Sequence, residues 1–181
     1  QPLKKDTISE VELELLAGEP LQLFALALEL AQEIPLRITR VSKAERGYRL
    51  QCPDRARMPK PISAAKLQQQ SPQQPFTQQL EGVQSAIERY EFLGESALLA
   101  DIQSSLVELL RLAESPSLPI ASKTRATLKQ CSEQLALLIT TTKFKSPEST
   151  DQAAIKQLLQ SQPFALCLLE LSYQAYQSAT E

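Results

Sequence analysis

Hydrophobic residues recur every three to four positions through the second half of the chain, a spacing typical of helices with one apolar face. Helices are predicted over residues 77–93, 96–113, 122–141, 149–159 and 163–176, with Gly94 ending the first. The aligned apolar residues of the first three are Leu80, Val83, Ile87, Tyr90, Leu98, Ile102, Leu106, Leu109, Leu128, Cys131, Leu135, Leu138 and Ile139. Because such faces are buried against one another, residues 77–181 are predicted to form a bundle of four to five helices.

The last predicted helix, FALCLLELSYQAY after Pro163, is apolar on almost every side. A helix of this kind is usually surrounded by neighbours, so we expect it at the centre of the bundle. The alternative is a bundle that leaves one side of this helix open. Tyrosines are favoured at interfaces, and the open side would then bind a partner or a second copy through Leu166, Leu169, Tyr173 and Tyr176.

The N-terminal segment 7–17, TISEVELELLA, carries two conflicting patterns. Thr7 with Glu10 and Ser9 with Glu12 match the capping box that begins helices. The alternation of Val11, Leu13 and Leu15 is instead typical of a strand. We favour a helix here, and a second helix over 21–33 after Pro20.

Residues 36–52 are predicted to form a β-hairpin. LRITRVS and GYRLQC read as two short strands around KAERG, and Tyr48, Leu50 and Cys52 alternate with polar residues. Gly47 could then supply the unusual backbone angle of the turn.

Five prolines and repeated glutamines between Pro53 and Pro75 leave little to bury, which indicates a connector. The predicted organisation is therefore an α+β module over 1–62 (a helix plus a basic hairpin), a Pro/Gln-rich linker over 63–76 and a helical bundle over 77–181. The fold class is mostly α.

Charge is distributed unevenly, although the net charge of the 181-residue chain is only −2. Segment 37–60 holds eight basic residues against Glu45 and Asp54, a local charge of +6 that leaves −8 elsewhere. The basic residues are Arg37, Arg40, Lys43, Arg46, Arg49, Arg55, Arg57 and Lys60. Three interpretations remain open: a solvated hairpin face, a surface that docks on an acidic protein, and a nucleic-acid contact.

An acidic stripe is predicted on the helix that begins at residue 77. Glu81, Glu88 and Glu91 fall within about 80° of one another at helical spacing. The stripe could face the basic segment within this chain or recruit a basic partner. A metal site is not expected there, because helical carboxylate sites usually add His and the chain contains none.

Several chemistries are excluded by composition. Without His there is no Ser-His or Cys-His pair, and the four scattered glycines cannot form a phosphate-binding loop. The motif Ser63-Ala64-Ala65-Lys66 resembles a penicillin-binding SxxK by chance, since its companion motifs are missing. Cys52, Cys131 and Cys167 lack metal or disulfide spacing and are expected to be reduced. No cofactor, metal or membrane span is expected, and the cytoplasm is the expected compartment.

Three functional hypotheses follow. The first is a non-catalytic adaptor or assembly subunit that binds another protein, or a second copy, through its helical bundle. The alternative is a nucleic-acid-binding protein that uses residues 37–60. The third is an enzyme without His, most plausibly one that uses a cysteine thiolate.

Overall fold

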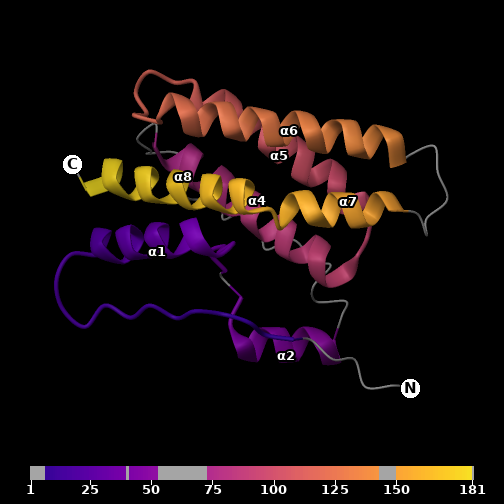
Figure 1. Ribbon diagram of the computed structural model, residues 1–181, viewed down its shortest axis with the longest axis horizontal. Coiled ribbons are helices and arrows are strands. Elements are labelled where there is room, and N and C mark those ends of the chain that lie inside the picture. The colour runs from indigo at the N-terminus through magenta and orange to yellow at the C-terminus, as the bar shows by residue number, and fades with distance from the viewer. Residues whose placement is uncertain (1–6, 40, 53–72, 143–149, 181) are drawn as a thin grey trace.

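The computed structural model describes residues 7–39, 41–52, 73–142 and 150–180 and confirms a mostly α fold (Figure 1). These ranges contain seven helices and no strand. The helices are α1 (Leu21–Glu33), α2 (Lys43–Gln51), α4 (Gln73–Leu93), α5 (Ala97–Ala113), α6 (Ser122–Thr142), α7 (Thr150–Leu159) and α8 (Gln162–Thr180). The helix number exceeds the four to five predicted, because α1 joins the bundle and α2 replaces the hairpin.

Helix α8 lies at the centre of the bundle, in contact with α1, α4, α6 and α7. α5 completes the bundle by packing between α4 and α6, and Figure 1 shows α6 and α1 on opposite sides of α8. The apolar faces predicted from the sequence meet in one continuous core, in which Ile102, Leu106, Leu135 and Leu171 are fully buried. Hydrophobic burial of these aliphatic side chains is the main stabilising contribution to the bundle.

Local signals in the sequence set the limits of several helices. Gly94 has φ of 68°, a left-handed conformation that favours glycine, and its N–H donates to the Tyr90 carbonyl at 2.7 Å. The predicted end of α4 is therefore confirmed. At the start of α8, the Gln162 side chain donates through Nε2 to the Ala31 carbonyl at 3.1 Å, which ties this end of α8 to the last turn of α1.

Residues 7–17, which we call the N-terminal strap, form no helix, so that prediction was wrong. The strap runs as an elongated segment beside α1 and toward α2 (Figure 1). In a helix Glu10 and Glu14 would lie one turn apart, and like charges at this spacing are destabilising. The elongated conformation instead lets Glu10 and Glu12 reach the same lysine, Lys43.

The predicted β-hairpin is also wrong, because residues 43–51 form helix α2. The Ser42 side chain caps this helix by accepting a hydrogen bond from the Glu45 N–H at 3.1 Å. Glu45 and Arg49, one turn apart, form an ion pair at 2.8 Å. Gly47 lies within the helix with open space around it, so it is not a turn residue. The alternation from Tyr48 to Cys52 was too short to separate a strand from a short helix.

Packing runs across the predicted domain boundaries. Helix α1, which was assigned to the N-terminal module, packs on α8. Helix α4 begins at Gln73, inside the segment assigned to the linker, and Phe76 is fully buried in the bundle core. Most of the predicted linker, residues 63–72, lies outside the described residues. Among the helices that the structure describes, none is long and apolar enough to cross a membrane.

Candidate functional site

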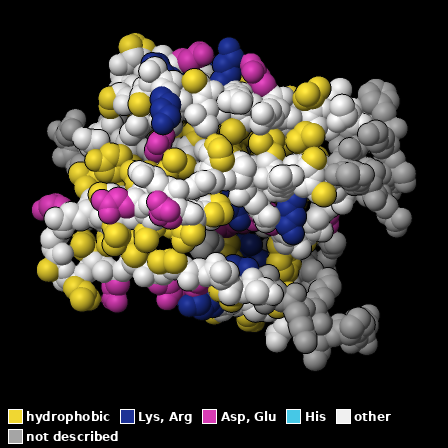
Figure 2. Space-filling view, in the orientation of Figure 1, with side chains coloured by type: hydrophobic (Ala, Val, Ile, Leu, Met, Phe, Trp, Pro, Cys, Tyr) yellow, Lys and Arg dark blue, Asp and Glu magenta, His cyan; other side chains and the backbone are white. Residues whose placement is uncertain are grey.

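A cleft of about 930 Å³ lies between the bundle and the layer formed by the strap and α2. In Figure 2 it is the hollow at the centre of the molecule, with basic and acidic side chains inside it. Apolar side chains from three helices form its bundle side: Ala27, Leu30, Ile87, Phe92, Leu168 and Leu169. Ser9 to Leu13 of the strap and residues of α2 line the opposite side.

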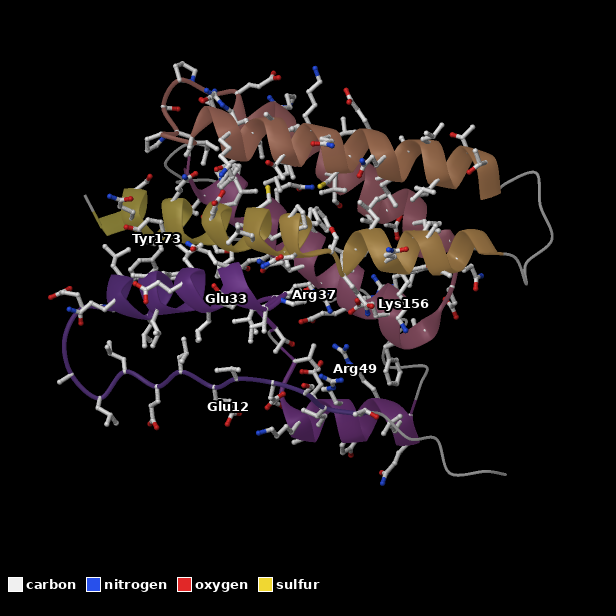
Figure 3. The ribbon with its side chains drawn as sticks, viewed as in Figure 1. Glu12, Glu33, Arg37, Arg49, Lys156 and Tyr173 are labelled. Carbon is white, nitrogen blue, oxygen red and sulfur yellow. The ribbon has the colours of Figure 1, made fainter. Side chains whose placement is uncertain are left out.

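Four of the eight predicted basic residues line this cleft. Arg37 comes from the segment after α1, and Lys43, Arg46 and Arg49 come from α2. Figure 3 shows Arg49 extending from α2 toward the bundle. The other four, Arg40, Arg55, Arg57 and Lys60, lie outside the described residues. The structure thus gathers the described half of the basic segment around one cleft.

The acidic stripe of α4 faces part of this basic segment. Arg37 donates through Nη2 to Glu91 Oε2 at 2.5 Å, and the pair is largely screened from solvent. Thr39 donates through Oγ1 to Glu88 Oε1 at 2.7 Å. Glu91 also accepts from Gln160 Nε2 at 3.1 Å, which links α4 to the end of α7. Glu81 does not line the cleft. Glu88 and Glu91 therefore bind the segment that connects α1 to α2.

Lys43 joins the strap to α2. Its ammonium group lies 2.8 Å from Glu10 Oε1 and 3.1 Å from Glu12 Oε1. The hydrogen bond that Lys43 donates to Glu10 raises the pKa of Lys43 and lowers the pKa of the Glu10 carboxyl. Arg46 adds a contact to the strap through Nη2, 3.4 Å from the Thr7 carbonyl.

Two of the four residues proposed as an open interface on α8, Tyr173 and Tyr176, contact α1. Phe24 packs against Tyr173 and Tyr176 with ring centroids 6.1 and 5.5 Å apart, and Figure 3 shows Tyr173 between the two helices. Leu169 is buried and lines the cleft, and Leu166 is half-buried. This part of α8 therefore makes contacts within the chain.

The described residues bear on two kinds of catalytic chemistry, that of metal ions and that of thiols. They contain no group of three or more Cys, Asp and Glu side chains placed to hold a metal ion. Burial raises the pKa of the Cys131 thiol to about 11, and burial together with the nearby Cys131 and Glu170 raises that of Cys167 further. Both thiols are therefore poor nucleophiles at neutral pH. Cys52 is exposed at the end of α2.

Sequence reasoning missed the strap carboxylates and Thr39 as parts of this site. Glu10 and Glu12 alternate with Val11 and Leu13, and that alternation was visible, but the capping-box pattern was weighted above it. For Thr39 the chain contained no comparable signal, because its contact with Glu88 joins residues 49 positions apart.

Comparisons with known proteins add no assignment to this site. No protein-family model, no curated protein and no solved structure matches the chain.

Proposed function

We propose that this protein is a non-catalytic interaction module, an adaptor or assembly subunit, whose binding surface is the cleft beside α2. The observation that supports this most directly is the composition of the cleft, in which an apolar side made by the bundle meets charged residues of both signs. Protein-binding surfaces commonly combine apolar anchors with charged residues that select the partner. A reducing, cytoplasmic location belongs to the same proposal and agrees with three unpaired thiols.

Nucleic acid is the weaker candidate ligand. Proteins that bind phosphate backbones present cations that exchange small counterions for phosphate. Here Arg37, Lys43 and Arg49 each have a carboxylate partner in the same chain, at 2.5 to 3.1 Å. These cations would have to leave protein carboxylates before they could contact a phosphate.

Site-specific photo-crosslinking tests this function. A photoreactive residue would replace Ala44, which is exposed and lines the cleft, and in a control would replace Leu137, which is 66% exposed on α6. In native lysate the Ala44 position should give a discrete protein adduct that the Leu137 position does not give. Equal adducts from both positions would contradict the proposal. Adducts that a nuclease removes would also contradict it, and nucleic acid would then be the favoured ligand.

A further inference from the structure

The N-terminal strap bounds the cleft without filling it. Ser9 to Leu13 line the cleft opposite Leu168 and Leu169 of α8, and about 930 Å³ of space remains inside it. The strap's own apolar residues are only partly covered, since Leu13 and Leu15 are half-buried but Ile8 is 40%, Val11 51% and Leu16 89% exposed. A well-packed segment would bury such side chains. The strap thus covers the apolar surface of the bundle only in part.

Polar contacts at one edge account for how the strap is held. Lys43 binds Glu10 and Glu12, and Arg46 reaches the carbonyl of Thr7. Between described residues, no backbone hydrogen bond joins residues 7–18 to another segment. Exposed ion pairs contribute little and exchange readily with water and salt. A competing carboxylate peptide could therefore replace these contacts at small cost.

The strap supplies negative charge to the basic residues that line the cleft. Arg37, Lys43, Arg46 and Arg49 are matched by Glu10, Glu12, Glu88 and Glu91. Without the two strap carboxylates, these four basic residues would face Glu88 and Glu91 of α4 and Glu45, the partner of Arg49 on α2, which leaves one positive charge in excess. A cleft with this excess of positive charge and an apolar side fits an acidic segment that also carries aliphatic residues.

Gly18 gives the strap a place to pivot. Its φ is 102°, in the left-handed region that favours glycine, so any other residue would strain the sharp turn into α1. Because helix α1 begins at Leu21, after this turn, the strap can swing away without unwinding α1.

We propose that the strap is an internal occupant of the cleft and that the partner docks by displacing it. The partner segment is an elongated acidic peptide in which carboxylates alternate with aliphatic residues, as Glu10, Val11, Glu12 and Leu13 do in the strap. Its carboxylates bind Lys43 and Arg46, and its aliphatic side chains enter the space beside α8. This inference rests on the proposed function and adds the class of partner and a mechanism of autoinhibition.

The strap sequence itself provides the probe. A fluorescein-labelled peptide with the sequence of residues 7–17 would be titrated into the full chain and followed by anisotropy. Three chains would be compared: the parent, the E10Q/E12Q variant, and a control with Glu14→Gln and Glu19→Gln. Glu14 and Glu19 do not line the cleft, so the control has the same change in net charge with the Lys43 contacts intact.

The peptide should bind the E10Q/E12Q chain about tenfold more tightly than the parent or the control, because an internal competitor reduces the apparent affinity in proportion to the fraction of molecules whose cleft is open. Adding Lys43→Gln to E10Q/E12Q should remove most of that gain. Limited proteolysis with thermolysin, which cleaves before aliphatic residues such as Leu13, would show whether the strap resists cleavage in the parent and becomes susceptible in E10Q/E12Q.

Three results would overturn the displacement mechanism. One is equal peptide binding, or no binding, by all three chains when proteolysis shows that the strap of E10Q/E12Q has been released. The second is a strap that thermolysin cleaves as fast in the parent as in E10Q/E12Q. The third is a light-scattering mass of a dimer with exchanged straps, which would make a second copy the occupant. The crosslink from Ala44 does not depend on the peptide, so its presence would preserve the proposed function in each of these cases.

Discussion

The helical bundle and the N-terminal region of this protein are held together by different forces. From α4 onward, buried aliphatic and aromatic side chains form one continuous core. Before α4, only Ala31 and Val41 are buried among the described hydrophobic residues. Within that region, α1 packs on α8, whereas the strap, α2 and the segment between α1 and α2 are held by side-chain contacts such as Arg37 with Glu91 and Lys43 with Glu10. The cleft lies where these two kinds of structure meet.

Because of this difference, the bundle should be the stable part of the molecule, and the strap and α2 should be the part that can rearrange. Burial of apolar surface is strong and cannot be replaced by solvent, whereas exposed ion pairs are weak and exchangeable. A partner could rearrange the strap and α2 while the bundle stays folded. Helix α1 is the intermediate case, because its Phe24 packs on the tyrosines of α8 while Leu26 on the same helix is 43% exposed.

The largest effect is expected in the core. Leu106→Ala removes a fully buried side chain of α5 and should lower the free energy of unfolding by about 2–5 kcal/mol, the lost burial plus the cavity left behind. Val11→Ala in the strap, where the side chain is 51% exposed, should change it by less than about 0.5 kcal/mol. Urea denaturation followed by circular dichroism measures both. A similar loss of unfolding free energy in the two variants would contradict the proposed difference between the regions.

Thiol reactivity compares the same two regions by chemistry. Because the pKa of Cys131 is raised to about 11, its thiolate fraction at neutral pH should be about a hundredfold below that of an ordinary thiol. Cys52, exposed after α2, should label first, and Cys131 and Cys167 only slowly. Mass spectrometry of iodoacetamide labelling at pH 7 reads this order, with urea-unfolded chain as the control. Fast labelling of Cys167 in the folded chain would favour the hypothesis of an enzyme that uses a cysteine thiolate.

The attachment of α1 should show an intermediate effect. Phe24→Ala removes both aromatic contacts with α8 and should destabilise by about 1–2 kcal/mol, less than a core deletion because Phe24 is half-buried. Hydrogen exchange should show faster opening of α1 while α5 and α6 remain protected. Leu26→Ala on the exposed side is the matched control. If α5 opens together with α1, the two regions form a single cooperative unit.

The smallest effect is expected at the ion pair across the cleft. A double-mutant cycle with Arg37→Gln and Glu91→Gln should give a coupling of about 0.5–1 kcal/mol that falls as salt is raised. The more exposed pair of Arg111 and Glu108 on α5 is the reference and should couple less. A salt-independent coupling would mean that Arg37 is held by packing and not by its charge.

The sequence predicted the bundle well and the N-terminal region poorly. Helices α1 and α4 to α8 were located to within a few residues, because apolar residues at helical spacing persist over many turns. Helix α2 has only nine residues and buries none of them, so no apolar periodicity marks it. Its one local signal, Ser42 followed by Glu45, is the same capping pattern that misled the assignment of the strap. A short pattern cannot decide between two conformations when no buried face adds to it.

The site depended even more on tertiary structure. The sequence identified Arg37, Lys43, Arg46 and Arg49 as a basic group and Glu88 and Glu91 as an acidic one, and it left open whether they face each other. It did not indicate that the strap supplies Glu10 and Glu12 to Lys43, a contact between residues more than thirty positions apart.

The sequence by itself determined that this protein is mostly helical, that its last helix is apolar enough to lie at the centre, and that His-dependent chemistry is excluded. Only the tertiary structure decided that residues 43–51 are a helix, that α1 covers the tyrosines of α8, and that the strap borders a charged cleft. The physical reason is the separation along the sequence of the residues that interact. Helical periodicity repeats among neighbours in the chain, whereas the ion pairs of the cleft depend on where distant segments come together.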